Sequence, residues 1–261
     1  MIKDHVIVIT CGSSGLGAEL VFGAVNKGAH VAFTYSSNTD RADRVVHRCA
    51  DLGSDVLAIK ADVVNEDDCK RVAREVSARW KGIDILINNA GTTRKAKHAD
   101  LDALNAEDFI AVYSVNVIGT YQMIRACVAH LRASKTGSVI NISSAGADLG
   151  VGTSVAYSAS KAALNSMTRS LARALAPELR INTVAPGFMA TPWFSDEMDP
   201  GAFSSLIEDQ RRLSVLDRVG DPVSMVDPIL FLASGAAAHI TGVTLPVEGG
   251  ALLGMAPHGL R

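Results

Sequence analysis

The chain has 261 residues, of which 48% are hydrophobic and 20% charged, the balance of an ordinary water-soluble globular protein. This length suits one compact domain with a large core. The net charge of −2 supplies no basic field of the kind that binds nucleic acid or an anionic membrane surface, so we expect neither as a partner.

Cysteine spacing and the first residues of the chain bear on its compartment. The four cysteines form no CxxC pair, and no His/Cys cluster has metal-ligand spacing, which predicts free thiols in a reducing compartment and no bound metal. The apolar run Val6–Ile9 is too short for a signal sequence or a membrane span. We therefore expect a cytoplasmic protein.

Short runs rich in valine and isoleucine alternate with longer amphipathic stretches. The expected strands are Val6–Ile9, His30–Thr34, Val56–Lys60, Ile83–Ile87, Ser138–Ile142, Arg180–Val184 and Val243–Pro246. The expected helices are Gly17–Lys27, Asp40–Leu52, Asp67–Trp80, Ala106–Ala133, Ala156–Leu175 and Val223–Ala233. This alternation requires βαβ crossovers, and it predicts a single α/β domain of Rossmann type, a doubly wound parallel sheet of about seven strands flanked by helices. Ligands of such sheets bind beyond the carboxyl ends of the strands.

The first expected strand leads directly into a glycine-rich turn, Thr10–Gly17, where the first helix begins. Glycines let the backbone approach a pyrophosphate, and the helix N-terminus offers unpaired N–H groups and a favourable dipole. Ser13 and Ser14 add hydroxyl donors. A glycine-rich turn that binds no ligand could have the same local sequence. The position of this turn between the first strand and the first helix favours dinucleotide binding.

These residues resemble the TGxxxGxG turn of the classical short-chain dehydrogenase/reductase family, with Thr10, Gly15 and Gly17 matching. Cys11 stands where the family has its first glycine. If that position requires a positive φ, Cys11 is strained there; a redox role for its thiol is the minor alternative. The resemblance implies that the turn binds a nicotinamide dinucleotide through Thr10, Gly12, Ser13, Ser14, Gly15, Leu16 and Gly17.

The end of the second strand bears on the choice of cofactor. By the resemblance, Tyr35 occupies the position of the carboxylate with which NAD-dependent members bind the adenosine ribose. Without a carboxylate a 2′-phosphate is not repelled, so NADP(H) is favoured over NAD(H), even though Ser14 and Ser36 stand where many NADP-dependent members carry a base. A polar loop with a helix cap is the alternative. The residues that could bind the phosphate are Ser36, Ser37, Asn38 and Arg41.

Three further segments that follow strands match cofactor contacts of the family. Asp62-Val63 matches the adenine-contacting pair, and Asn88–Gly91 matches the NNAG motif. Pro186–Thr191 matches the PGxxxT segment that holds the nicotinamide carboxamide. The contacts that the resemblance implies here are Asp62, Val63, Asn89, Ala90, Gly91, Pro186, Gly187, Met189 and Thr191.

Tyr157 and Lys161 lie one turn apart in an expected helix and therefore share a face. A nearby ammonium lowers the pKa of a phenol, ordinarily about 10, and makes it a usable general acid or base. The YxxxK spacing alone occurs by chance in many proteins. Ser144, thirteen positions before Tyr157, matches the catalytic serine of the family, and Asn116 matches its helix asparagine.

The resemblance implies hydride transfer between a nicotinamide and a carbonyl or secondary alcohol. Tyr157 would exchange the proton and Ser144 would polarise the carbonyl. Lys161 would lower the pKa of Tyr157 and bind the nicotinamide ribose, so that both residues contact the cofactor, and Asn116 would hold a relay water. The resemblance reaches Val247–Gly250, where Glu248 replaces the usual aspartate.

The small-molecule substrate is expected between Asp148–Val151 and a lid that contains Trp193, Phe194, Met198 and Phe203. We divide the domain into a cofactor half, about residues 1–140, and a catalytic and substrate half, about residues 141–261, with the lid at about 190–216. No basic cluster in these two walls indicates an acyl-carrier partner, but a 3-oxoacyl thioester reductase stays an alternative to a simple ketone reductase. A non-redox epimerase or lyase is the other alternative.

The two longest expected helices, Ala106–Ala133 and Ala156–Leu175, carry more apolar positions than one sheet face needs. The resemblance implies that they pair between subunits in a homotetramer. Burial within one subunit is the alternative.

Overall fold

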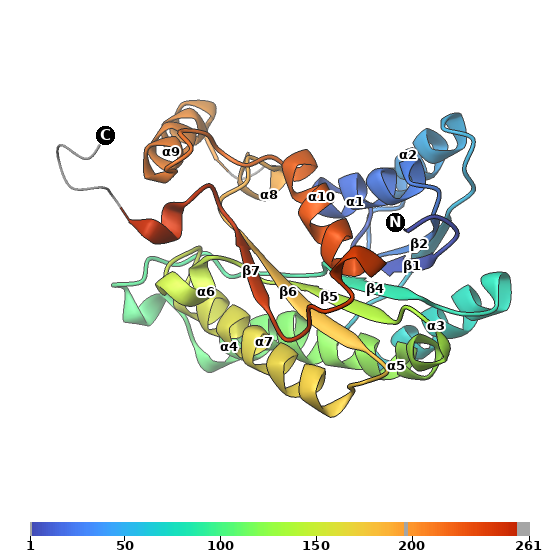
Figure 1. The fold of residues 1–261 in the computed structure, drawn as a ribbon. Helices are drawn as coiled ribbons and strands as arrows, with labels where there is room; N and C mark the ends of the chain where they lie inside the picture. Colours follow the sequence, from blue (N-terminus) through green and yellow to red (C-terminus); the bar gives the residue numbers. More distant parts are fainter. Residues whose placement is uncertain (1, 196–197, 255–261) are drawn as a thin grey trace.

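Seven parallel strands form one sheet with helices on both faces (Figure 1). The structure is a computed structural model that describes residues 2–195 and 198–254. The sheet has the order β3-β2-β1-β4-β5-β6-β7. The predicted doubly wound α/β domain of Rossmann type is thus confirmed. The strands are β1 (Val6–Ile9), β2 (His30–Tyr35), β3 (Leu57–Lys60), β4 (Ile85–Asn88), β5 (Ser138–Ile142), β6 (Arg180–Pro186) and β7 (Thr244–Val247).

The strand order reverses beside β1, which pairs with β2 on one side and with β4 on the other. Ile7 of β1 lies opposite Val31 of β2 and Ile85 of β4. Because β1 and β4 are neighbours, the segments that follow them begin side by side at this point of reversal. In doubly wound sheets the ligand binds at such a point, beyond the carboxyl ends of the strands.

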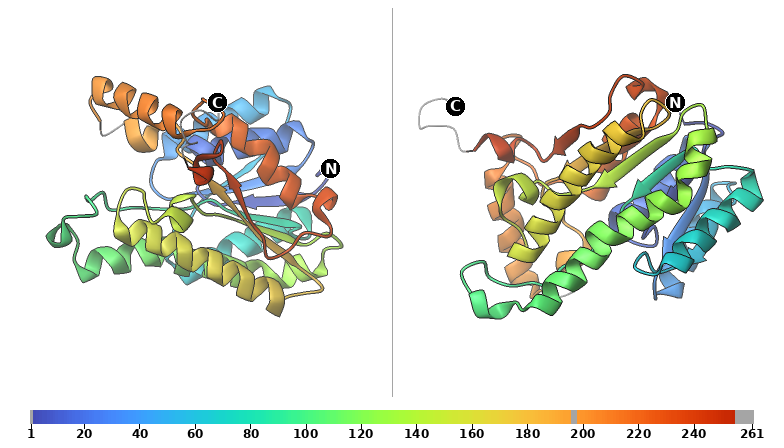
Figure 2. Two further views of the ribbon diagram at one scale, coloured as in Figure 1. Left: turned by 60° about the vertical axis from the view of Figure 1, so that its left-hand side comes forward. Right: turned by 90° about the horizontal axis from the view of Figure 1, so that it is seen from below.

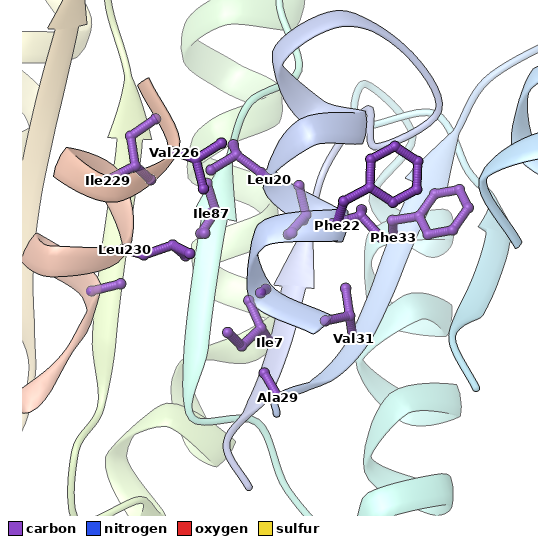
Figure 3. Close-up of a cluster of buried hydrophobic side chains, with 14 of the residues drawn as sticks. Ile7, Leu20, Phe22, Ala29, Val31, Phe33, Ile87, Val226, Ile229 and Leu230 are labelled. Carbon is purple, nitrogen blue, oxygen red and sulfur yellow. The ribbon is translucent and has the colours of Figure 1, made fainter. Parts of the chain in front are cut away.

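One face of the sheet is covered by α1 (Gly15–Asn26), α2 (Thr39–Asp51) and α10 (Pro222–Ala233) (Figure 1). Pro222 begins α10 behind the capping residue Asp221, which accepts a hydrogen bond from Ser224 N–H. An added Cβ at Gly23 would lie 2.3 Å from Val226 Cγ1, so the glycine permits the close approach of α1 and α10. Figure 3 shows the core between these helices and the sheet, which includes Ile7, Leu20, Phe22, Val31, Phe33, Ile87, Val226, Ile229 and Leu230.

The other face is covered by α3 (Glu66–Trp80), α5 (Thr120–Ala133) and α7 (Val155–Ala174) (Figure 2). Asn65 caps α3 by accepting hydrogen bonds from the N–H groups of Asp67 and Asp68. Buried apolar side chains of α3 and α5 pack on the sheet, and each contributes about 1.5–3 kcal/mol when fully removed from water. They include Val72, Val76, Met123, Cys127 and Leu131.

The expected helix Ala106–Ala133 is interrupted in the structure. It consists of α4 (Ala106–Tyr113), a π-helical segment (Ser114–Gly119) and α5. The predicted helical range is thus confirmed, but the sequence did not predict the π-helical turn at its centre, which contains Asn116, one of the predicted catalytic residues. Single π-helical turns are frequent at functional sites.

Several short elements follow the strand ends. They are α6 (Gly146–Leu149), α8 (Pro192–Ser195), α9 (Pro200–Leu213) and 3₁₀ turns at Leu101–Ala103, Gly235–Ala237 and Ala251–Leu253. The predicted lid thus contains α8 and α9, and its residues 196 and 197 lie outside the described part of the chain. Among the described helices, none has the length and apolar character needed to cross a membrane.

Candidate active site

The turn between β1 and α1 contains two residues in the left-handed region, Cys11 at φ 55° and Gly15 at φ 51°. The strain predicted for Cys11 is therefore present. An added Cβ at Gly12 would lie 2.4 Å from Phe33 Cβ, and one at Gly17 would lie 2.1 Å from the Cys11 carbonyl oxygen. Both positions exclude a side chain. At Gly15, by contrast, an added Cβ would meet nothing within 4 Å.

The start of α1 is open to an anion. Ser14 is the N-cap residue, with extended backbone at φ −159° and ψ 165°, and its side chain makes no capping hydrogen bond. The first N–H groups of the helix and the Ser14 hydroxyl are then free to bind a phosphate. Ser13 is half-buried and Leu16 is buried in the core beneath the turn. With the open space at Gly15, these residues fit the pyrophosphate of a dinucleotide.

The end of β4 holds the turn in place. Thr10 Oγ1 accepts hydrogen bonds from the N–H groups of Asn89 and Ala90, at 2.9 and 2.8 Å. Asn89 Nδ2 donates in return to the carbonyl oxygens of Thr10 and Cys11, at 3.2 and 3.1 Å. The structure therefore brings the predicted residues Thr10, Asn89 and Ala90 together, and their side-chain contacts fix the shape of the turn.

The sequence left a redox role for the Cys11 thiol as a minor alternative, and the surroundings of the thiol bear on it. The residue is exposed on the turn, and desolvation raises the pKa of its thiol. A reactive thiolate at a helix N-terminus has a lowered pKa instead. The direction of the shift speaks against a redox role.

The segment after β2 lies beside the turn. Tyr35 is half-buried, Ser36 and Ser37 are exposed, and Asn38 Oδ1 accepts a hydrogen bond from Arg41 N–H at 2.8 Å. Asn38 is therefore the N-cap of α2, as the alternative interpretation of this loop expected. No carboxylate occupies the Tyr35 position.

A groove of about 430 Å³ runs between α1 and α2 next to this loop. Ser13 and Ser14 of the turn line it together with three arginines of α2. The Arg48 guanidinium lies 3.9 Å from the centroid of the Phe22 ring and 3.8 Å from Glu19. Sequence reasoning found only the first of these arginines, although their i, i+3, i+7 spacing on one helix could have revealed all three: Arg41, Arg44 and Arg48.

Asp62 and Val63 follow β3, as predicted. The Asp62 carboxylate accepts a hydrogen bond from Val64 N–H at 2.9 Å and so holds its own loop. Val63 is buried against Gly119, where an added Cβ would lie 2.6 Å from Val63 Cγ2. This close packing fixes the loop against the π-helical segment.

Tyr157 and Ser144 meet at the carboxyl ends of β5 and β6. Ser154 Oγ caps α7 by accepting a hydrogen bond from Tyr157 N–H at 3.2 Å, which sets Tyr157 in the first turn. The Ser144 side chain hydrogen-bonds the Tyr157 side chain, and Ser144 Oγ also accepts from Gly146 N–H at 3.1 Å. The neighbouring Ser143 is buried and donates to the Lys161 carbonyl oxygen at 3.2 Å. Ser143 is thus used for packing, and Ser144 faces the tyrosine.

Lys161 is buried on the same face of α7. Its Nζ donates to the Ile142 carbonyl oxygen at 2.8 Å and lies 5.8 Å from the centroid of the Tyr157 ring. An added Cβ at Gly91 would lie 3.5 Å from Lys161 Nζ and 3.5 Å from Asn116 Oδ1. Gly91 therefore leaves the space between the lysine and the asparagine open, and the four predicted catalytic residues lie together.

Asn116 anchors the loop that follows β4. Its Oδ1 accepts from Thr92 N–H at 2.8 Å, and its Nδ2 donates to the Thr92 carbonyl oxygen at 3.0 Å and to Ser160 Oγ at 2.9 Å. The buried Asn116 amide thus makes hydrogen bonds to the backbone of Thr92 and to Ser160 of α7. An asparagine in mid-helix was expected to have a polar role, and in the structure Asn116 makes this pair of hydrogen bonds to Thr92.

Burial dominates the ionisation of the pair. Desolvation raises the pKa of Tyr157, while the hydrogen bond with Ser144 lowers it. Desolvation also lowers the pKa of Lys161 to about 8. The sequence predicted a Tyr157 pKa lowered by Lys161; in the structure burial raises that pKa, and the group that lowers it is Ser144.

The segment after β6 borders the same site. The Pro186 carbonyl oxygen accepts from Ala145 N–H at 2.9 Å, beside Ser144, and Gly187 N–H donates to the Val247 carbonyl oxygen at 3.0 Å. An added Cβ at Gly187 would lie 2.8 Å from Glu248 Cβ, so Glu248 packs directly on this segment. Met189 forms an isolated parallel bridge with Gly220, and Thr191 is buried.

Two segments border the Tyr157 ring. Trp193 of α8 lies beside it, with ring centroids 6.4 Å apart. An added Cβ at Gly152 would lie 3.4 Å from Tyr157 Cδ1, and Leu149 and Val151 in the same segment are exposed. The loop after β4 forms a further wall, which sequence reasoning missed although it carries a basic cluster, Arg94, Lys95, Lys97 and His98. Within residues 2–195 and 198–254, no group of His, Cys, Asp and Glu side chains could hold a metal ion.

Residues 11–251 match a family model described as Enoyl-(Acyl carrier protein) reductase. The chain is 34% identical over 248 residues to a Streptomyces violaceoruber protein named as a ketoacyl reductase of the granaticin polyketide synthase, covering 95% of this chain and 96% of that protein. It is 31% identical to the 3-oxoacyl-[acyl-carrier-protein] reductase FabG of Staphylococcus aureus, covering 93% of this chain and 96% of that protein.

A crystal structure described as a short-chain dehydrogenase/reductase from Burkholderia xenovorans superposes with a TM-score of 0.87 and 38% identity, covering 97% of this chain and all of that one. The chain therefore belongs to the classical short-chain dehydrogenase/reductase family. It is an NAD(P)-dependent oxidoreductase that transfers a hydride between a nicotinamide and a carbonyl or secondary alcohol.

Proposed function

We propose that the protein reduces a ketone to a secondary alcohol with NADPH and that Tyr157, Ser144, Lys161 and Asn116 carry the proton chemistry. The observation that carries the proposal is the side-chain hydrogen bond between Ser144 and Tyr157, which brings two hydroxyl groups together, with Lys161 Nζ 5.8 Å from the centroid of the Tyr157 ring. Two such donors can hold the oxygen of a carbonyl as negative charge develops on it. The nicotinamide supplies the hydride when it is bound.

In this mechanism the Tyr157 hydroxyl gives its proton to the substrate oxygen, and Ser144 Oγ–H donates a hydrogen bond to the same oxygen. The phenolate that remains is stabilised by the Lys161 ammonium and regains its proton from solvent. Asn116 holds the Thr92 peptide near Lys161. In the proposed mechanism this keeps open the space at Gly91, between Asn116 and Lys161, through which a water reaches the lysine. Lys161 also binds the nicotinamide ribose.

The proposed substrate is a 3-oxoacyl thioester or a ketone of similar shape. The names of two relatives, a ketoacyl reductase and a 3-oxoacyl-[acyl-carrier-protein] reductase, support this class. The basic loop Arg94–His98 adds support because it could attract an acidic carrier. A non-redox reaction has no specific observation in its favour.

The cofactor proposed is NADP(H). The argument rests on Tyr35, which brings no carboxylate to the adenosine ribose, and on the groove in which Arg44 and Arg48 accompany Arg41 next to Ser14. Three guanidinium groups near one ribose would favour a 2′-phosphate through charge-assisted hydrogen bonds. The remaining cofactor contacts are the residues of the turn and of the segments after β3, β4 and β6 described above.

The activity is tested in the reducing direction with acetoacetyl thioester and with crotonyl thioester, each with NADPH and NADH, and in reverse with 3-hydroxybutyryl thioester and NADP⁺ or NAD⁺. The proposal expects NADPH-dependent formation of the 3-hydroxy product and no reduction of the crotonyl double bond. Reduction of crotonyl thioester alone would contradict it.

The cofactor assignment has its own test. Arg44→Ala should weaken NADPH binding, followed by nucleotide fluorescence, by about tenfold because one charged contact is lost, while NADH binding stays unchanged. Arg74→Ala, an exposed arginine on α3 at the opposite face, is the matched control. Equal loss for both nucleotides would contradict the assignment.

The proposed assembly is a cytoplasmic homotetramer with a cofactor half at about residues 1–140 and a catalytic half at about 141–261. Exposed apolar side chains on α4, on the π-helical segment and at the start of α5 support subunit contact: Phe109, Ile110, Ile118 and Tyr121. Light scattering after size exclusion should give four times the mass of 27.4 kDa. A monomer mass would contradict the proposed assembly.

A further inference from the structure

The indole of Trp193 lies beside the ring of Tyr157. Its ring centroid lies 6.4 Å from that of Tyr157, with the planes at 55°, and 39% of the residue is exposed. A tilted ring pair at this distance leaves a face of the indole uncovered beside the tyrosine. The exposed part of the indole is therefore available to an apolar group of a substrate bound beside Tyr157.

The backbone of Trp193 is fixed from the loop that follows β4. Lys95 Nζ donates a hydrogen bond to the Trp193 carbonyl oxygen at 3.3 Å and lies 6.0 Å from the centroid of the Phe194 ring. Phe194 in turn packs on Phe188, with ring centroids 4.7 Å apart. The lysine and this aromatic pair together hold α8 over the catalytic residues.

The same loop is attached to the segment that leads into α7. Thr93 Oγ1 and Thr153 Oγ1 lie 2.6 Å apart, and Ala96 N–H donates to the Thr153 carbonyl oxygen at 2.9 Å. His98 Nε2 lies 3.3 Å from the Gly152 carbonyl oxygen. Because Asn116 also binds Thr92 at the start of the loop, the position of Trp193 is coupled to the frame that holds Tyr157.

We propose that Trp193 determines substrate specificity by stacking on a planar apolar group bonded to the reacting carbonyl, so that the preferred substrates are aryl or conjugated ketones. Lys95 is the positioning residue that keeps the indole over Tyr157. The inference rests on the proposed ketone reduction and adds the substrate class. Flat π-systems gain from offset or tilted contact with an indole beyond the burial of their area, whereas a saturated ring of equal size does not.

Three 3-oxo esters test the inference, because they differ only in the group beside the ketone: ethyl benzoylacetate (phenyl), its cyclohexyl analogue, and ethyl acetoacetate (methyl). With the wild-type protein and NADPH, kcat/KM should be about tenfold higher for the phenyl ester than for the cyclohexyl ester. Trp193→Ala should lower kcat/KM about tenfold for the phenyl ester and less for the methyl ester, and so remove that preference. Trp193→Phe should keep most of it.

Leu52→Ala, which truncates an exposed apolar side chain at the end of α2 and outside the lid, is the matched control and should leave all three rates unchanged. An equal loss on all three esters in Trp193→Ala would show that the indole only packs the lid, and faster reduction of the phenyl ester would show that it obstructs the site; either result overturns the inference. Failure of the wild type to reduce any of the esters with NADPH or NADH would overturn the proposed function itself.

Lys95 is tested by the split between KM and kcat. Lys95→Ala should raise KM for the phenyl ester several-fold with a much smaller change in kcat for the same ester, and Lys95→Arg should restore KM because it keeps a donor to the Trp193 carbonyl. A merely structural role would instead lower the thermal midpoint and kcat together, without rescue by arginine, and that result would contradict the positioning role.

Discussion

Cys11 carries a left-handed backbone conformation at the entrance to the candidate cofactor turn. A side chain in this region places Cβ close to the following carbonyl oxygen, at a cost of about 1–2 kcal/mol. The chain tolerates the cost because Cys11 is held on both sides: its N–H donates to Thr34 Oγ1 at 3.1 Å, and its carbonyl oxygen accepts from Asn89 Nδ2.

Cys11→Gly should raise the free energy of unfolding by about 1 kcal/mol, because glycine adopts this conformation without strain. Chemical denaturation of the protein without nucleotide measures the change. Gly15→Ala is the matched opposite control, since an added Cβ there meets no neighbour but has the same unfavourable φ, and it should destabilise by a similar amount. A less stable Cys11→Gly protein would contradict this account.

Lys161 imposes a pH dependence on stability. Its pKa is lowered by burial to about 8 in the folded protein, from 10.5. Between these values the unfolded chain binds the additional proton, so the free energy of unfolding should rise with pH through this window. Below about pH 8 both states are protonated, and the buried ammonium then costs about 3 kcal/mol in full.

The prediction is measured against Lys161→Met, which removes the charge and keeps the apolar stem. The stability of the wild type relative to this variant should increase from pH 8 to pH 10, and the comparison cancels the titration of all other groups. A constant difference across this range would show that Lys161 is not desolvated in the folded protein.

At the scale of elements, a row of polar side chains crosses the sheet beneath α7. Asn88 of β4, Asn141 of β5 and Thr183 of β6 are register neighbours. Asn88 Nδ2 donates to Asn141 Oδ1 at 2.9 Å, and Asn141 Nδ2 and Thr183 Oγ1 both donate to Thr168 Oγ1 of α7, at 2.9 and 2.8 Å. Thr168 thus joins the helix that carries Tyr157 to the strands beside the cofactor turn.

Thr168→Val should destabilise the fold by about 2–4 kcal/mol, because it leaves two buried donors unpaired at nearly unchanged volume. The measurement is the denaturation midpoint. Ser170→Ala, at an exposed position of the same helix, should be nearly neutral. Similar small effects for both variants would contradict a structural role for the row.

The elements show what the sequence could predict. The Val/Ile runs predicted all seven strands within a few residues, because strands buried on both faces leave a continuous apolar signal. The interruption at Ser114–Gly119 left no such signal, since its cause is a tertiary one: Asn116 turns inward to bind Thr92 and Ser160. The apolar pattern of Ala106–Ala133 is nearly the same with or without the π-helical turn.

At the scale of the whole molecule, the motifs could place the catalytic group because each follows a strand, and parallel strands end at one edge of the sheet. Asn116, Ser144, Tyr157 and Lys161 are indeed close together. The contacts between loops could not be predicted, since Lys95 and Trp193 are 98 residues apart and no periodicity relates them. The arginines of α2 could have been found from their spacing.

The roles of the four residues stay a prediction, and one substitution tests them most directly. Tyr157→Phe removes only the hydroxyl that donates the proton and leaves the cofactor turn unchanged. We predict that NADPH-dependent reduction of acetoacetyl thioester falls by about 10²–10⁴-fold, while NADPH binding, followed by nucleotide fluorescence, changes less than about twofold. Reduction at the wild-type rate in this variant would contradict the central claim, because another group would then supply the proton.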